Sequence, residues 1–228
     1  MSSESAGARG SNRIVIFTGP SLHPAEATTL LDATYLPPVK RGDLARLLAW
    51  QPSTVGIIDG EFYQSLAVTP KEVLALLETG VAVYGAASMG ALRAVELHRH
   101  GMIGVGSVFR LFRKGVLNAD DEVALVYSGE TYQAVSEPLI NTRYALRAAV
   151  RRGFLTRAEA EAIVSRVKSV YFPERTRQLV LSIAREVAGG ERTKSLRAFL
   201  ATGAPDVKRR DARLLLARIR RDRDARSR

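Results

Sequence analysis

The segment VAVYGAASMGALRAVELHRHG at residues 81–101 decides the fold class, because it predicts a buried strand, a turn of small residues and a helix in direct succession. The apolar run at 81–84 predicts the strand, and the helix is expected over 89–99, ending at Gly101. Two other buried strands end in similar turns. They are RIVIF at 13–17, which precedes TGPS, and VGII at 55–58, which precedes DGEF.

Helices are expected between these strands, at 24–31, 43–50 and 70–79, with one more short strand at 33–35. Asp43 stands where the N-cap of the second helix is expected. Strands that alternate with helices, each strand a continuous apolar run, predict an α/β fold with a parallel sheet covered by helices on both faces. Right-handed crossovers place the three turns at the carboxyl edge of the sheet, where ligands bind in such folds.

The rest of the chain is expected to be mainly helical. Residues 104–127 suggest a short helix, a glycine turn and then either a strand or a helix. Thr156 and Glu159 form a capping box for a helix over 157–171, and Pro173 interrupts it before further helices at 175–188, 194–201 and 207–224. These patterns divide the chain into a disordered lead-in (1–12), an α/β core domain (13–150), a helical region (151–204) and an Arg-rich helical tail (205–228).

The net charge of +11 is concentrated in the second half of the chain. Residues 1–127 have a net charge of −1 and residues 128–228 a net charge of +12, with 10 basic and 3 acidic residues at 208–228. This asymmetry favours an acidic partner for the basic part, and a merely solvated helix is the alternative. Nucleic-acid binding ranks last, because neither a known nucleic-acid module nor an aromatic stacking platform accompanies the charge.

Composition excludes several classes of site. Cysteine is absent, which rules out disulfides, thiolate metal sites and cysteine nucleophiles. Gly19-Pro20-Ser21 lacks the GK[ST] ending of a phosphate-binding loop, so no ATP site is expected. No apolar run approaches the roughly 20 residues of a membrane helix, and the N-terminus lacks a signal-peptide core. We therefore expect a cytoplasmic protein with no metal and no cofactor.

Ser88 is the first candidate for chemistry. It follows a strand, precedes a helix and has small residues two positions away on each side, a relaxed form of the nucleophile elbow. The Met89 amide at the helix N-terminus would then stabilise an oxyanion. The alternative is that Ser88 only caps the helix. The segment ASMGA at 87–91 also resembles the nucleophile segment of Clp-type serine peptidases.

A serine nucleophile needs a base, and the histidines are poorly placed to supply one. His98 lies ten residues along the same helix, roughly 15 Å up its axis, and His23 lies in the first turn. Asp59 at the end of the third strand is better placed as a base or an orienting group, although it could equally bond its own turn.

Further polar residues surround these turns. Arg93 could attract an anion near the helix start or pair with Glu96, and the acidic triplet at 120–122 favours capping or salt bridges over a magnesium site. The candidate catalytic residues are Ser88, Asp59 and Arg93. The candidate substrate-binding and oxyanion residues are Met89, Gly90, Gly19, Pro20, Ser21, Gly60, Asp43 and Glu96. Gly85, Ala86 and Gly90 are expected to leave room for an extended peptide tail.

Several segments together resemble the TfuA-like proteins. They are FTGPSL at 17–22, PPVKRGD at 37–43, IIDGEF at 57–62, GAASMGALRAVELHRHGMIGVG at 85–106 and DDEV at 120–123. The resemblance covers about residues 14–127 in order, and the C-terminal helical part is similar only in general character.

The resemblance implies a role in peptide backbone thioamidation. TfuA-like proteins accompany YcaO-type enzymes, which use ATP to activate a backbone amide for displacement by sulfide. The implied partners are the YcaO-type enzyme, a thiocarboxylated ubiquitin-like sulfur carrier and the precursor peptide. The implied role is release of sulfide from the carrier thiocarboxylate or activation of the YcaO-type enzyme. For the hydrolysis, our hypothesis assigns Ser88 as nucleophile, Asp59 to proton handling and Arg93 to attraction of the carrier terminus. The competing hypothesis is a non-catalytic scaffold or activator that docks the YcaO-type enzyme or its peptide through the basic helices.

Overall fold

The computed structural model describes residues 13–63 and 66–226, so the predicted lead-in at 1–12 lies outside the described residues. Its centre is a five-stranded parallel sheet in the order β2-β1-β3-β4-β5. The strands are β1 (Ile14–Phe17), β2 (Thr34–Leu36), β3 (Thr54–Ile57), β4 (Ala82–Gly85) and β5 (Ile103–Gly104). The predicted α/β fold with a parallel sheet is confirmed.

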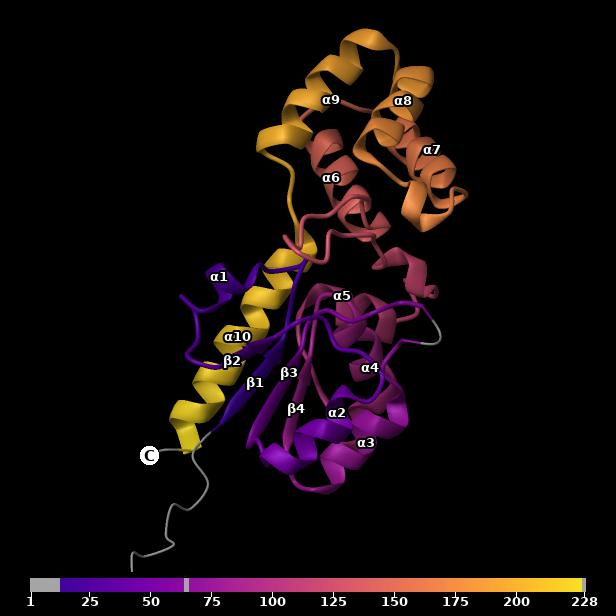
Figure 1. Ribbon diagram of the computed structural model, residues 1–228. Coiled ribbons are helices and arrows are strands. Elements are labelled where there is room, and N and C mark those ends of the chain that lie inside the picture. The colour runs from indigo at the N-terminus through magenta and orange to yellow at the C-terminus, as the bar shows by residue number, and fades with distance from the viewer. Residues whose placement is uncertain (1–12, 64–65, 227–228) are drawn as a thin grey trace, which may run out of the picture.

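Both faces of the sheet are covered, because alternate residues of each strand point to opposite sides. Val15 and Phe17 pack toward α2 (Asp43–Leu47), α3 (Pro70–Glu78) and α4 (Met89–Leu97), with α5 (Gly106–Arg113) beside them. Ile14 and Ile16 face α10 (Val207–Arg226), which Figure 1 shows lying along the sheet. The short helix α1 (Pro24–Ala27) follows β1.

The C-terminal basic segment is therefore part of this layered core. Ala212, Leu215 and Ile219 of α10 are buried against the sheet, and a side chain on Gly56 of β3 would meet two of them within 3.1 Å. Most of the arginines of α10 lie on its outer face, where Arg209 and Arg213 pair with Glu26. Removing residues 205–228 would consequently uncover one face of the sheet.

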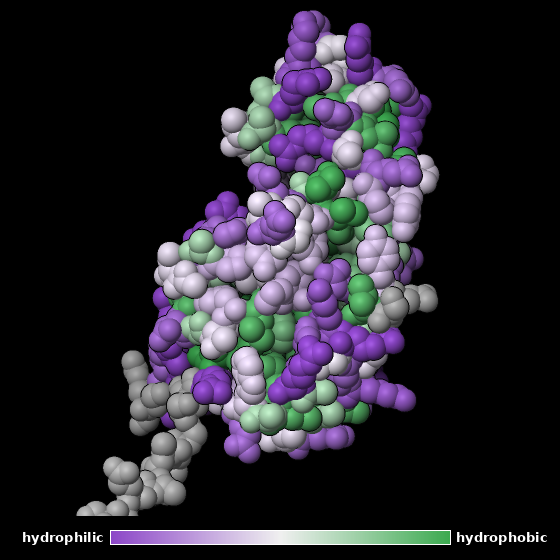
Figure 2. Space-filling model, in the orientation of Figure 1, coloured by the Kyte–Doolittle hydropathy of each residue, from purple (hydrophilic) through white to green (hydrophobic). Residues whose placement is uncertain are grey.

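The remaining helices form a separate cluster at one end of the sheet (Figure 1). They are α6 (Leu139–Arg151), α7 (Arg157–Lys168), α8 (Arg177–Ala188) and α9 (Gly190–Thr202), which share one hydrophobic core. On the face drawn in Figure 2, hydrophilic residues cover most of this cluster and hydrophobic residues show between them. None of the helices in the described part of the chain combines the length and hydropathy of a membrane-spanning segment.

Local signals in the sequence account for several of these boundaries. The predicted capping box of Thr156 and Glu159 is present at the start of α7, and Pro173 lies in the 3₁₀ turn Phe172–Glu174 that separates α7 from α8. A second capping box, Thr69 with Glu72, begins α3. The helix predicted over 89–99 ends at Leu97, with a 3₁₀ turn (His98–His100) before Gly101.

Other expectations were wrong. The N-cap of α2 is Gly42 in a left-handed conformation, and Asp43 is the first helical residue, whose carboxylate accepts a hydrogen bond from the Lys40 N–H at 2.8 Å. The second helix is also shorter than 43–50, since Leu48–Trp50 is a 3₁₀ turn. Residues 123–127 form neither a strand nor a helix; they follow the 3₁₀ turn Asp120–Glu122 and extend over the sheet edge. Strand β5 and helix α6 had no counterpart in the sequence-based prediction.

Candidate functional site

Asp59 organises the turn after β1. Its carboxylate accepts hydrogen bonds from the backbone N–H groups of Gly19 and Ser21, at 3.0 and 2.9 Å, and from the Ser21 hydroxyl at 2.6 Å. The carboxyl edge of β3 thus fixes the TGPS turn of β1, as expected for neighbouring parallel strands. Since Asp59 is buried and bound by three donors, the geometry favours an orienting and electrostatic role over that of a mobile base.

Ser88 lies at a sharp turn between β4 and α4. The residue before it, Ala87, has a φ of 63°, a conformation that side-chain-bearing residues rarely adopt. Ser88 occupies the N-cap position, but its side chain makes no capping hydrogen bond. The hydroxyl instead donates a long hydrogen bond of 3.5 Å to the carbonyl oxygen of Val123. The structure therefore does not show the side-chain cap that was the alternative interpretation of Ser88.

Lys208 reaches the same carbonyl oxygen from the opposite end of the chain. It lies in the first turn of α10, is 1% exposed, and donates from Nζ to Val123 O at 2.7 Å. Ser88 Oγ and Lys208 Nζ are thus both within 3.5 Å of one oxygen atom. The sequence-based prediction did not include Lys208.

Burial changes the titration of both buried charges. Loss of hydration lowers the pKa of Lys208, and the negative charge of Asp59 partly opposes that change. Burial likewise raises the pKa of Asp59, while Lys208 and the hydrogen bonds from Ser21 and Gly19 oppose the rise. A lysine with a lowered pKa that shares a hydrogen-bond acceptor with a serine hydroxyl is a candidate general base for that serine.

The glycines around Ser88 serve packing. A Cβ on Gly90 would lie 1.7 Å from Ile57 O, and one on Gly85 would lie 2.0 Å from Gly90 O. These two glycines let α4 approach β3 and β4, so the room expected there for a peptide tail is filled by the protein's own backbone. Gly60 and Gly19 are also closely approached, by Met89 and by Pro38.

The amide of Met89 remains available at the N-terminus of α4. Gly90 N–H donates to Ile58 O at 3.3 Å, whereas no hydrogen bond from the Met89 N–H is present within the described part of the chain. The sequence predicted this N–H, with the helix dipole behind it, as an oxyanion donor, and the structure leaves it without an acceptor in the described residues.

Other predicted residues lie in structural contacts. Arg93 donates from Nε to Val68 O at 2.9 Å and forms an ion pair with Glu96, which directs its guanidinium toward the segment before α3. Pro20 lies in the turn bound by Asp59. His23 caps α1 by accepting from the Ala25 N–H, and His98 Nδ1 lies 2.8 Å from Val95 O.

A comparison with protein families identifies the chain. The model of the TfuA-like protein family matches residues 59–176, slightly more than half of the chain. The chain belongs to the TfuA-like protein family. No curated protein in the comparison matches it. TfuA-like proteins are associated with YcaO-type enzymes and have an accessory role in thioamidation at the level of the family. The match extends past residue 127 into the helical cluster, and it leaves out the first three strands at one end and α8, α9 and α10 at the other.

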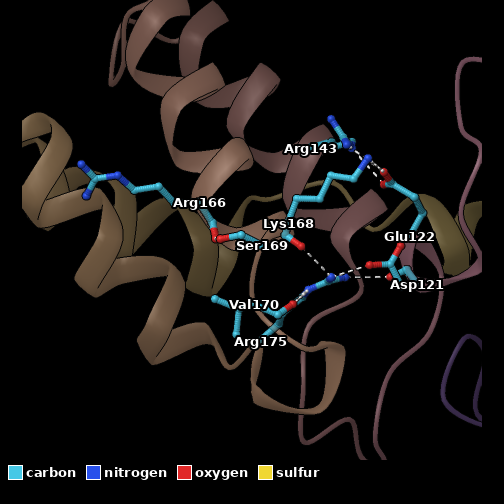
Figure 3. A network of polar contacts seen from close by, with 8 residues as sticks. All are labelled: Asp121, Glu122, Arg143, Arg166, Lys168, Ser169, Val170 and Arg175. Atoms are coloured by element: carbon cyan, nitrogen blue, oxygen red, sulfur yellow. Dashed lines mark hydrogen bonds and ion pairs between the residues drawn. The ribbon is translucent and has the colours of Figure 1, made fainter.

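In this TfuA-like protein Asp121 and Glu122 of the acidic triplet bind residues of the helical cluster, as Figure 3 shows. Arg175, 1% exposed, pairs with the Asp121 carboxylate and also donates to the backbone oxygens of Asp121 and Val170. Glu122 is equally buried and pairs with Arg143, with Lys168 at 3.9 Å. The expected salt-bridging role is confirmed, and these contacts hold the two residues that precede Val123.

No group of three histidine, aspartate or glutamate residues in the described ranges is arranged to bind a metal ion. A pocket of about 380 Å³ opens beside Gly60. Aromatic and proline side chains dominate its lining, which includes Pro37, Pro38, Phe62, Tyr63, Tyr127, Tyr132 and Phe172. The Tyr127 hydroxyl donates to Glu61 at 2.7 Å, which closes one wall of the pocket.

Proposed function

We propose that this TfuA-like protein hydrolyses the C-terminal thiocarboxylate of a ubiquitin-like sulfur-carrier protein and supplies the sulfide to a YcaO-type enzyme that thioamidates a ribosomally made peptide. The observation that carries the proposal is the convergence of Ser88 Oγ and Lys208 Nζ on Val123 O. It supplies a nucleophile and a base within a buried site that has one unengaged backbone N–H.

In the proposed reaction, Ser88 Oγ attacks the thiocarboxylate carbon and neutral Lys208 accepts the hydroxyl proton. The Met89 N–H stabilises the tetrahedral oxyanion. Protonated Lys208 returns this proton to the departing sulfur, so that collapse breaks the carbon–sulfur bond and releases hydrosulfide, leaving the carrier acyl group on Ser88 and Lys208 neutral again. Lys208 then activates a water that cleaves the ester, which regenerates Ser88 and yields the carrier carboxylate. Direct attack by a Lys208-activated water gives the same products.

The carrier tail would enter along the pocket beside Gly60. Its lining of aromatic and proline side chains suits an extended peptide tail whose own side chains are small. Ser88 itself is 2% exposed and lies beneath the segment that begins at Val123. Acylation therefore requires this segment to move away from the serine.

The test is sulfide release from a thiocarboxylated carrier without any YcaO-type enzyme. We expect release by the wild type and a loss of about 10³-fold or more in Ser88→Ala. The matched control is Ser182→Ala, which replaces an exposed serine on α8 and should release sulfide at the wild-type rate. Normal release by Ser88→Ala would eliminate the serine mechanism. Absence of release by the wild type would favour the scaffold hypothesis.

The pH profile tests the base. Activity should rise as the pH increases through the pKa of Lys208, which burial places below its ordinary value. The charge of Asp59 raises that pKa, so Asp59→Asn should move the acid limb of kcat/KM to lower pH. A limb that stays in place or moves to higher pH would contradict the assignment of Lys208.

A further inference from the structure

A groove of about 650 Å³ lies between α6 and α7, and its lining does not include Ser88, Asp59 or Lys208. Its floor is apolar and is formed by Leu146, Val150, Ala160 and Val164. Its rim is basic and includes Arg143, Arg147, Arg151, Arg157 and Lys168, with Glu161 as the single acidic lining residue. An apolar floor with a cationic border fits a ligand that is itself apolar on one side and acidic on the other.

The cations on α6 form a row. Arg143, Arg147 and Arg151 are spaced by four residues, so they lie along one stripe of the helix. Arg147 and Arg151 are exposed, and neither forms an ion pair within residues 13–63 and 66–226. Like charges at this spacing repel each other, so an anionic partner stabilises the row.

We propose that the groove between α6 and α7 docks an amphipathic helix of the YcaO-type enzyme, with acidic residues along the side that faces α6. The proposal rests on the proposed function in one respect, since that function assigns the sulfur carrier to the sheet edge and leaves this groove to the enzyme. A helix supplies apolar residues at intervals of three and four for the floor, and a flanking acidic row for the rim.

Two other occupants fit less well. A second copy of this chain would bring its own basic half, which has a net charge of +12, against the basic rim. A nucleic-acid backbone would satisfy the arginines but would leave Val150 and Val164 without an apolar partner.

The variants must leave the sheet edge intact. Arg143 and Lys168 hold Glu122 next to Val123, so replacing them would also disturb the candidate site. Arg147 and Arg151 have no such contact, and the test therefore uses the double reversal R147E/R151E. The matched control is R185E/R197E, which changes the net charge equally at exposed positions on α8 and α9 outside the groove.

Affinity for the purified YcaO-type enzyme is measured by calorimetry at low and high salt, without the carrier. We expect R147E/R151E to weaken binding about 10-fold or more at low salt, with a smaller salt dependence than the wild type, and R185E/R197E to bind normally. Val164→Gln, which changes only the floor, should weaken binding at both salt concentrations.

Three results would overturn the proposal: undiminished binding by R147E/R151E, an equal loss in R185E/R197E, or no binding by the wild type. Salt-dependent binding of unrelated RNA that R147E/R151E abolishes, with enzyme binding intact, would assign the groove to nucleic acid and also overturn it. Because the carrier is absent, none of these results depends on whether Ser88 hydrolyses a thiocarboxylate.

Discussion

Replacing Lys208 with methionine should destabilise the protein by about 3 kcal/mol or more, because the buried Asp59 carboxylate loses its compensating charge and Val123 O loses a donor. Asp59→Asn should have a similar effect of about 3 kcal/mol, since it leaves the Lys208 ammonium uncompensated and disturbs three hydrogen bonds from the β1 turn. The two charges do not form a direct ion pair of 4.0 Å or less, so they interact through longer-range electrostatics.

The double variant separates the charge interaction from the local contacts. Once one charge is gone, removing the other no longer leaves a buried charge uncompensated. D59N/K208M should therefore be destabilised by about 1–3 kcal/mol less than the sum of the single variants. Unfolding in urea, followed by circular dichroism, gives the four free energies of the cycle.

The pH dependence has a definite sign. Burial raises the pKa of Asp59 in the folded protein, and loss of Lys208 raises it further. A carboxyl group whose folded pKa is raised contributes stability at low pH that is lost as the pH rises through that pKa. The loss of unfolding free energy in Lys208→Met, relative to the wild type, should consequently become smaller as the solution is acidified. Additive effects within about 0.5 kcal/mol, or a deficit that grows in acid, would refute the coupling of these two groups.

Two further predictions concern the frame around the site, and both are measured by urea unfolding. Gly90→Ala places a methyl group 1.7 Å from Ile57 O and should cost about 3 kcal/mol or more, whereas Gly129→Ala, with nothing within 4 Å, should change stability by less than about 0.5 kcal/mol. Arg175→Lys removes the guanidinium group that donates to Asp121 and should lower the free energy of unfolding by about 2–4 kcal/mol. Arg177→Lys, at an exposed position, should lower it by less than about 0.5 kcal/mol. Equal effects within either pair would contradict the packing described.

The α/β core was predictable because its signals are local. Each buried strand is an uninterrupted apolar run, and each turn after it contains glycine or proline, so the alternation is visible along the chain. Strand β5 was missed because Ile103–Gly104 is two residues long and exists only through pairing with β4. The Asp43 cap was wrong because Gly42, with a φ of 89°, already makes the turn into α2.

The candidate site was only partly predictable. Ser88 and Asp59 both follow strands and therefore stand out, whereas Lys208 begins a 21-residue segment with ten basic residues that resembles a solvated surface. A signal was nevertheless present in α10. Its buried residues, Val207, Lys208, Asp211, Ala212, Leu215, Leu216 and Ile219, follow the spacing of one helix face. Lys208 and Asp211 lie on that apolar face, which distinguishes them from the arginines around them.

The segment at 121–123, which covers Ser88, contacts three parts of the molecule that are distant in the sequence. Val123 O binds Ser88 from the sheet edge and Lys208 from α10, while the two residues before it are held by arginines of the helical cluster. The family match spans Asp59, Ser88, Val123 and Arg175 but ends before Lys208. The proposed nucleophile and its cover thus lie within the matched region, and the proposed base comes from a helix outside it. Because that helix also forms one face of the sheet, the base cannot be removed by truncation without exposing the core, and point substitution at Lys208 is the informative experiment.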